Sequence, residues 1–259
     1  MKTLSLDQFP STVKSASWFA FASPPVFYRV AGKCIPWLFA IAAVLTVAGL
    51  VIGFLLAPTD QQQGDAYRII FIHVPAAWLS MLIYLAVSFW SAISLIFNTR
   101  LAAMLARALV PGGAIFTILA LWTGAFWGRP TWGAWWVWDA RLTSELILLF
   151  LYLGLMALQA AIDDTRRADR AGAVLALIGV VNIPVIYFSV KWWNTLHQGA
   201  SVSLTAAPKM ASIMLSGMLI MTLALWTYAI AIALWRVRLL ILDRERHTVW
   251  VQAATGGQS

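Results

Sequence analysis

The chain contains few charged residues and almost no cysteine. Only 11% of its 259 residues are charged and 61% are hydrophobic, whereas about a quarter of the residues in a soluble domain are charged. This balance excludes an ordinary soluble domain and indicates an integral membrane protein. Cys34 is the only cysteine, which excludes an internal disulfide and a C-x-x-C-H motif for covalent haem attachment. A P-loop, a Gly-rich dinucleotide motif and a Ser/His/Asp arrangement are also missing from the sequence.

Six apolar runs are each close to the roughly 20 residues that a helix needs to cross a bilayer. They cover residues 36–57, 74–97, 108–127, 146–162, 171–190 and 210–235. The predicted fold class is therefore an all-α integral membrane protein, a bundle of six transmembrane helices that forms a single domain over residues 1–259. Asn182 and Pro184 are predicted to interrupt the fifth helix. A flexible tail is expected at about residues 250–259.

Positive charge is distributed unequally between the two sets of connections. If successive spans alternate in direction, 13 of the 18 Lys and Arg residues fall on one side, and the other side holds only Arg68, Arg129, Arg141, Lys191 and Lys209. The positive-inside rule then predicts that both termini are cytoplasmic. The connections around residues 58–73, 128–145 and 191–209 are expected on the outer side.

Six of the 15 tryptophans lie between Trp122 and Trp138. Four of them fall in residues 132–138, directly before Asp139, in the connection between the third and fourth spans. An aromatic belt at the membrane interface is the alternative interpretation, but it accounts less well for this density. The cluster predicts a platform for a flat, apolar ligand, because indole faces bury large areas with few rotatable bonds.

Two of the three histidines, His73 and His197, flank the Trp-rich connection on the same predicted side. His73 precedes Pro75, which fits the first turn of the second span, and His197 follows the pair Trp192 and Trp193. Each histidine alone is typical of an ordinary interfacial residue, whereas together they indicate a shared ligand. Haem suits the pattern because its iron takes axial imidazoles. Zinc suits it less well, because zinc usually has three or four protein ligands and this side has no third histidine.

Polar residues beside the cluster have more than one interpretation. The outer arginines available to the anionic propionates of haem are Arg68, Arg129 and Arg141. Asp139 is expected either to pair with Arg141 or to cap the fourth span, and Thr143 or Ser144 is the alternative N-cap. Glu145 is expected in the first turn of that helix. No carboxylate suited to proton relay is predicted within the spans.

These residues give the chain a resemblance to the haem-handling membrane proteins that share a tryptophan-rich WWD segment. Within that group the chain resembles the CcmC family of the system I cytochrome c maturation pathway. The matching stretches are residues 60–75, 127–153 and 192–201. The second stretch contains the sequence Trp-Gly-Ala-Trp-Trp-Val-Trp-Asp-Ala-Arg. Six spans and a chain of this length also agree with the family.

The resemblance implies roles for particular residues. His73 and His197 match the axial haem ligands, and the haem platform matches Trp127, Trp132, Trp135, Trp136, Trp138 and Asp139. Family residues that govern complex assembly or release match Asp60, Gln63 and Arg68. The cofactor implied is haem b, held transiently and without a covalent bond.

The resemblance also implies a non-enzymatic role. Such a protein presents haem at the periplasmic face to the membrane-anchored haem chaperone CcmE, and its other partners are the small subunit CcmD and the ABC-type subunits CcmA and CcmB. One alternative function is a haem exporter that moves haem across the inner membrane, although no polar stripe crossing the bilayer is evident in the sequence. A second alternative is a structural anchor for an ABC complex, with the tryptophans serving as a belt.

Overall fold

The structure is a computed structural model that describes residues 23–255 apart from 200–201, 203–206 and 209. Most of the described residues are helical, and the α-helices are α1 (Pro24–Leu50), α2 (Ile70–Phe97), α3 (Arg100–Trp132), α4 (Ala140–Ala160), α5 (Thr165–Gly179), α6 (Asn182–Trp192), α7 (Ser212–Arg244) and α8 (Val249–Thr255). Six helical segments are long and apolar enough to cross a membrane, with α5 and α6 forming one of them. The predicted fold class is confirmed.

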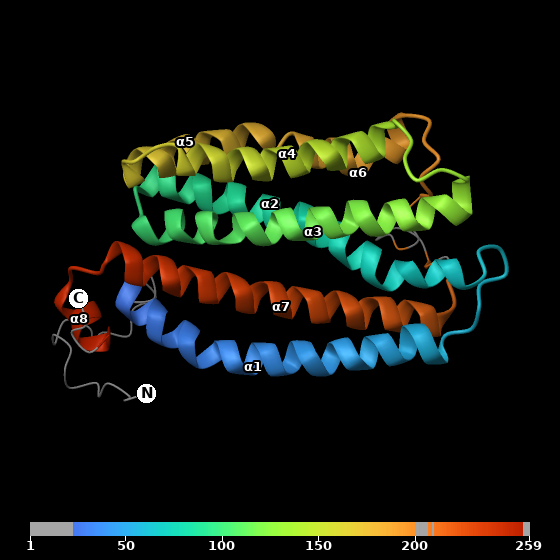
Figure 1. The fold of residues 1–259 in the computed structure, drawn as a ribbon, viewed down its shortest axis with the longest axis horizontal. Helices are drawn as coiled ribbons and strands as arrows, with labels where there is room; N and C mark the ends of the chain where they lie inside the picture. Colours follow the sequence, from blue (N-terminus) through green and yellow to red (C-terminus); the bar gives the residue numbers. More distant parts are fainter. Residues whose placement is uncertain (1–22, 200–201, 203–206, 209, 256–259) are drawn as a thin grey trace.

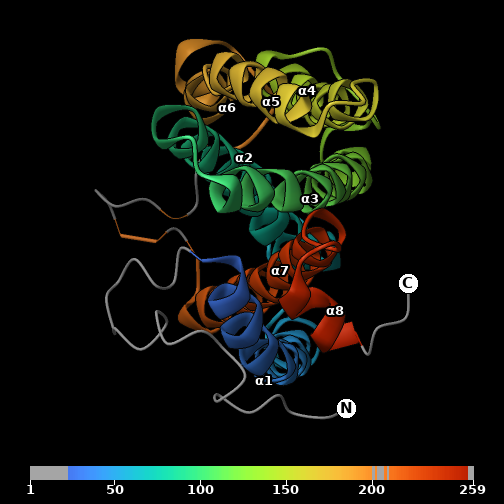
Figure 2. The same cartoon turned by 90° about the vertical axis from the view of Figure 1, so that its left-hand side faces the viewer.

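The helices form three layers (Figures 1 and 2). The layer of α2 and α3 lies in the middle. The layer of α1 and α7 lies on one side of it, and the outermost layer on the other side holds α4, α5 and α6. The main hydrophobic core lies between the middle and outermost layers, where Tyr84 of α2 and Tyr152 of α4 are fully buried and pack edge to face. Gly113 of α3 accommodates the Tyr152 ring, because a Cβ at this glycine would clash with it.

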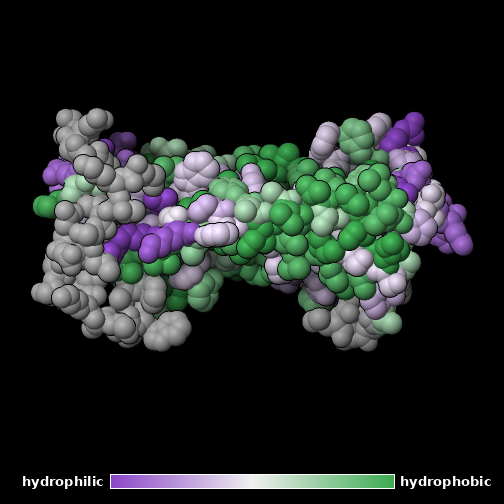
Figure 3. Space-filling model, turned by 90° about the horizontal axis from the view of Figure 1, so that it is seen from below, coloured by the Kyte–Doolittle hydropathy of each residue, from purple (hydrophilic) through white to green (hydrophobic). Residues whose placement is uncertain are grey.

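The connections predicted to be outer all lie at one end of the bundle, on the right in Figure 1. The beginning of α1 and the end of α7 lie at the opposite end. Figure 3 shows hydrophobic residues over much of the bundle's length and hydrophilic residues towards its two ends. This distribution agrees with a membrane-spanning bundle. Which end faces the periplasm stays a prediction, and Lys2, Lys14 and Lys209, which contribute to it, lie outside the described residues.

Several helices begin earlier than the hydropathy pattern predicts. Helix α1 starts at Pro24, twelve residues before the apolar run, and continues as a π-helical segment, Val51–Leu56. Helix α2 starts at Ile70 after a 3₁₀ turn, so Pro75 lies inside the helix and not in its first turn. Polar and charged residues at a helix end are solvated at the interface, so helical structure continues beyond the apolar run.

The fifth and fourth spans bear on two further predictions. The interruption near Asn182 is confirmed, because α5 ends at Gly179 and α6 starts at Asn182.

Helix α4 starts at Ala140, so Glu145 lies two residues beyond the first turn and inside a membrane-spanning helix. The prediction that Glu145 lies in the first turn is therefore wrong, and this residue is a buried carboxyl group, 6% exposed, within a span.

The C-terminal segment begins with structure. Helix α8 covers Val249–Thr255, and the Trp250 indole donates a hydrogen bond to Glu245 Oε2 at 2.8 Å and packs against Tyr28. The prediction of a flexible tail from about residue 250 does not describe this helix. Residues 256–259 lie outside the described residues.

Candidate haem-binding site

The Trp-rich connection is shorter than predicted, because α3 extends to Trp132 and α4 starts at Ala140. Gly133 ends α3 with a φ of 78°, a left-handed conformation that favours glycine. Asp139 is the N-cap of α4 and accepts a hydrogen bond from the Leu142 backbone N–H at 2.8 Å. Of the predicted caps, Asp139 is therefore confirmed, and Thr143 and Ser144 are wrong because both lie inside the helix.

His73 lies near the start of α2 with its ring buried against α3. Its Nδ1 atom is 3.0 Å from the Ala120 carbonyl oxygen and 3.1 Å from Thr123 Oγ1. A proton on Nδ1 satisfies the carbonyl and leaves the Nε2 lone pair free for a metal, the arrangement usual for metal-binding histidines. Gly124 permits this close packing, since a Cβ there would come within 3.0 Å of the ring.

His197 lies on the connection after α6 and is held by its neighbours. Its Nδ1 atom is 2.8 Å from the Gln198 carbonyl oxygen, so its Nε2 atom is also free. Its backbone N–H donates to Thr195 Oγ1 at 3.0 Å, and the Thr195 hydroxyl donates to Asp139 Oδ2. This chain of bonds ties the third outer connection to the end of the Trp-rich connection.

Burial favours the neutral form of His197. Burial, together with the positive charge of Arg141, lowers the pKa of His197 below the usual value for imidazole. Hydrogen bonding to Gln198 and the charge of Asp139 oppose this shift with smaller effects. A neutral imidazole at neutral pH is the form that ligates a metal.

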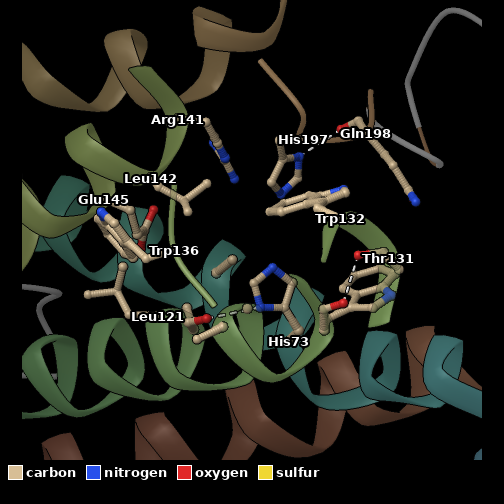
Figure 4. Close-up of a pocket in the computed structure, with 15 residues that line it drawn as sticks. His73, Leu121, Thr131, Trp132, Trp136, Arg141, Leu142, Glu145, His197 and Gln198 are labelled. Carbon is tan, nitrogen blue, oxygen red and sulfur yellow. Dashed lines mark hydrogen bonds between the residues drawn. The ribbon is translucent and has the colours of Figure 1, made fainter. Parts of the chain in front are cut away.

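The two imidazole rings face each other across the cavity (Figure 4), and their centroids are 6.4 Å apart with planes inclined by 37°. Two imidazoles on one iron require about 2 Å per iron–nitrogen bond and about 1 Å from each nitrogen to its ring centre, which sums to roughly 6 Å. The separation of the two rings therefore fits an iron between them.

The cavity between the histidines is lined mainly by apolar and aromatic side chains. The Trp127, Trp132 and Trp136 rings line it, and their neighbours include Leu121 and Leu142. Trp127 packs edge on against His73, with ring centroids 5.6 Å apart. The cavity has a volume of about 60 Å³ and is partly open to the surroundings.

Trp135 and Trp138 have a different position. Trp135 is 53% exposed and packs against Phe126, and Trp138 is 78% exposed and packs against Trp136. Neither residue lines the cavity. Trp136 and Trp138 together line an apolar groove between α3 and α4 on the side of the bundle. The structure thus brings three of the five predicted platform tryptophans to the cavity.

Two polar atoms in the cavity wall lack hydrogen-bond partners, and of these only the indole N–H is a donor that a guest carboxylate would satisfy. The Trp136 indole N–H and Glu145 Oε2 are buried without a hydrogen-bond partner. The Arg141 side chain lines the cavity and donates from Nη1 to the Ile186 carbonyl oxygen at 2.6 Å. Arg129 instead donates to the Gly133 carbonyl oxygen at the end of its own helix.

The first outer connection supports the cavity from outside. Gln63 Oε1 accepts a hydrogen bond from the Trp127 indole at 2.7 Å, and Asp60 Oδ1 accepts bonds from the Gln62 and Gln63 backbones. Arg68 donates to Asp65 and to the Gly53 carbonyl oxygen, and it does not line the cavity. Gln63 is therefore the residue of this set that connects to the histidine site.

Sequence reasoning missed the residues that position the two histidines. Thr123 and the Ala120 carbonyl hold His73, and Thr195 links His197 to Asp139. Glu145 was assigned only to the end of a helix, although it lines the cavity. In the sequence, Thr195 stands two residues before His197, which is only a weak indication that it positions the histidine. The contact of the Ala120 carbonyl with the His73 ring is visible only in the fold.

Comparison with known proteins identifies the family of the chain. A family model described as CcmC, Heme exporter protein C, matches residues 17–252. The Heme exporter protein C of Escherichia coli is 47% identical over 234 residues, covering 89% of this chain and 93% of the relative. The protein of the same name from Haemophilus influenzae is 42% identical over 233 residues, covering 90% of this chain and 95% of the relative. A relative from Marchantia polymorpha, described as a ccmC-like mitochondrial protein of cytochrome c biosynthesis, is 47% identical over 159 residues, covering 61% of this chain and 67% of the relative. With a match across nearly its whole length, the chain belongs to the heme exporter protein C (CcmC) family of membrane haem-handling proteins.

Proposed function

We propose that this protein binds haem at the periplasmic end of its bundle, with iron between His73 and His197, and presents the haem to the chaperone CcmE. The observation that carries the proposal is the pair of imidazoles, one buried and one half-buried, each bonded to a carbonyl through Nδ1, with ring centroids 6.4 Å apart. Each is the tautomer needed for ligation. Trp127, Trp132 and Trp136 then pack against the macrocycle, and Arg141 faces a propionate.

The remaining platform residues support the site indirectly. Asp139 fixes the start of α4 and, through Thr195, the connection that carries His197. Trp135 and Trp138 are exposed beside the cavity and are available to a docking partner. Asp60, Gln63 and Arg68 shape the first outer connection, which extends beyond the end of the bundle in Figure 1. These surfaces are the proposed places for contact with CcmE and for control of release.

The proposal includes the setting of the protein. The haem is haem b, bound without a covalent bond and passed on. The protein lies in the bacterial inner membrane with both termini cytoplasmic, and it assembles with CcmD, CcmA and CcmB. Helix α1 and the π-helical segment after it offer a surface for such assembly, because exposed apolar side chains follow them from Trp37 to Leu55.

The experiment is an absorption spectrum of the purified protein with matched histidine variants. Wild-type protein is expected to carry haem with a low-spin spectrum of two imidazole ligands. The His73→Ala/His197→Ala double variant is expected to lose far more haem than either single variant. His247→Ala is the control, since His247 belongs to the segment between α7 and α8, which lies at the opposite end of the bundle. Unchanged haem content in the double variant contradicts the ligand assignment.

Export of haem across the membrane is the second candidate, and the name shared by the relatives, Heme exporter protein C, favours it. Among the described residues, however, the core below the cavity is closed by fully buried side chains, including Tyr84, Leu148 and Tyr152. Presentation at the outer face needs no passage through this core. Proteoliposomes that contain only this protein test the difference, because export predicts accumulation of haem on the far side and presentation predicts none.

A further inference from the structure

A basic cavity lies at the end of the bundle opposite the histidines, where α3 and α5 begin and α7 ends (Figure 1). It has a volume of about 790 Å³ and is partly open to the surroundings, a size within the range of about 300–1,000 Å³ that is usual for ligand sites. Three carboxylates and five arginines line it, which gives a formal net charge of +2 when His247 is neutral. The arginines are Arg100, Arg166, Arg170, Arg244 and Arg246.

The three carboxylates of the cavity already have partners. Asp169 pairs with Arg244 at 2.7 Å. Asp243 lies 3.9 Å from Arg246, and Glu245 accepts a hydrogen bond from an indole N–H of α8. These contacts leave the other three arginines of the cavity without an opposite charge.

The three remaining arginines converge on the cavity from two helix starts. Among the described residues, no carboxylate lies within ion-pair distance of Arg100, Arg166 or Arg170. Arg100 is the first residue of α3 and Arg166 the second of α5, where the helix dipole makes a cation unfavourable. Orientation in the membrane requires positive charge on this side, but it does not require charges gathered at helix starts around one cavity.

The start of α3 adds unsatisfied donors to the same cavity. Thr99 is the N-cap residue and lines the cavity, but its side chain does not cap the helix and its buried hydroxyl has no hydrogen-bond partner. The first amide groups of a helix lack partners within the helix and bind anions. Together with three guanidinium groups, this donor set suits a phosphate group.

Apolar side chains next to the cavity indicate which kind of phosphate it takes. Ile96 and Phe97 end α2 directly before Asn98, which lines the cavity, and they are 72% and 63% exposed. A free phosphate ion makes no contact with apolar surface, whereas a phospholipid has its headgroup at the membrane interface and its acyl chains against the apolar part of the spans. Basic cavities between membrane helices on the cytoplasmic side bind anionic lipid headgroups.

We propose that this cavity is a binding site for an anionic phospholipid, whose phosphodiester headgroup is bound by Arg100, Arg166 and Arg170. The acyl chains then lie against the exposed end of α2. Because α7, α3 and α5 belong to the three different layers of the bundle, a headgroup bound here connects all three layers. The site is remote from the histidines, so the inference does not depend on the proposed function.

The test is a lipid titration of the purified protein, freed of lipid in a neutral detergent and followed by native mass spectrometry. Phosphatidylglycerol is the anionic probe, and phosphatidylcholine, whose headgroup has no net charge, is the comparison. Wild type is expected to bind phosphatidylglycerol about tenfold more tightly than phosphatidylcholine. Arg166→Gln/Arg170→Gln is expected to bind phosphatidylglycerol roughly 30-fold more weakly, because each basic residue strengthens the attraction of an anionic lipid about fivefold.

Three further measurements separate the cavity from general charge. Arg167→Gln/Lys33→Gln is the matched control, a loss of two charges on the same predicted side at exposed residues that do not line the cavity. Arg100→Gln is expected to weaken phosphatidylglycerol binding about fivefold, and it tests the site from α3 even if the double variant at α5 does not fold. Inorganic phosphate in large excess is expected to leave the lipid bound, because it has no acyl chains.

The outcomes are distinct. Equal affinity for the two lipids, or equal losses in the cavity and control variants, would overturn the inference. Displacement of the lipid by inorganic phosphate would assign the cavity to a free anion. Unchanged lipid binding together with loss of the ABC-type subunits from the purified complex would assign it to protein docking. Haem content, measured in the same preparations, is expected to stay at the wild-type level, so each of these results leaves the proposed function intact.

Discussion

The hydroxyl of Thr195 links two parts of the site, and its removal is the most informative test of how His197 is positioned. Thr195 donates to Asp139 and accepts from the His197 backbone N–H. In Thr195→Val both bonds are lost with little change in shape. The Asp139 carboxylate then loses a donor, and the connection carrying His197 loses its attachment to α4.

The expected magnitude follows from these two bonds. A hydrogen bond to a charged group contributes about 1.5–3 kcal/mol and a neutral one about 1 kcal/mol. Part of this energy is recovered by water at the partly exposed site, so about 2 kcal/mol of the preference for the ligating position is lost. That corresponds to roughly a 30-fold weaker haem affinity, within the range of about 10–100-fold seen for residues that orient metal ligands.

The assay is haem titration of the purified protein, with the spectrum recorded at saturation. Thr195→Val is expected to show weaker binding and a partial loss of the spectrum of two imidazole ligands. Thr227→Val is the control, since its hydroxyl bonds only to the Leu223 carbonyl oxygen of its own helix. Wild-type affinity and spectrum in Thr195→Val would refute the reasoning that Asp139 acts through Thr195.

Three other predictions concern the support of the cavity and the opposite end of the bundle. Gln63→Leu removes the acceptor of the Trp127 indole and is expected to weaken haem binding several-fold in a titration, whereas Gln62→Leu, at an exposed neighbour, should not. Trp136→Ala is expected to reduce haem content more than Trp135→Ala, because only Trp136 lines the cavity; equal losses at equal thermal stability would contradict this. Asp169→Asn breaks a 2.7 Å ion pair with Arg244 and a 3.7 Å contact with Arg107, so it should lower the free energy of unfolding by about 3 kcal/mol with the haem spectrum unchanged; Asp163→Asn, at an exposed position, is the control.

The sequence predicts the fold well because membrane spans are defined by length and hydropathy. Six spans follow from those properties, and the break before Asn182 follows from the Asn and Pro residues inside the fifth apolar run. The placement of His73 and His197 at one end follows from counting spans, since alternate connections of a bundle share an end. The predicted helix ends are wrong by several residues, because hydropathy decreases at a span's end before the helix itself ends.

The details of the site depend on rotation and register, which hydropathy does not reveal. Trp135 and Trp136 are neighbours in the sequence, but only Trp136 lines the cavity. Glu145 is placed in the cavity because α4 starts at Ala140 and turns this side chain towards Ser80. Thr195 reaches Asp139 across 56 residues of sequence. Such contacts come from the packing of helices and not from any local pattern.

The central claim is that one iron is shared by His73 and His197. Its most direct test is the spectrum of His197→Gly with haem, recorded before and after the addition of free imidazole. A shared iron predicts that the low-spin spectrum of two imidazole ligands is lost in His197→Gly and restored when imidazole occupies the vacated position. A wild-type spectrum in His197→Gly without added imidazole would contradict the claim.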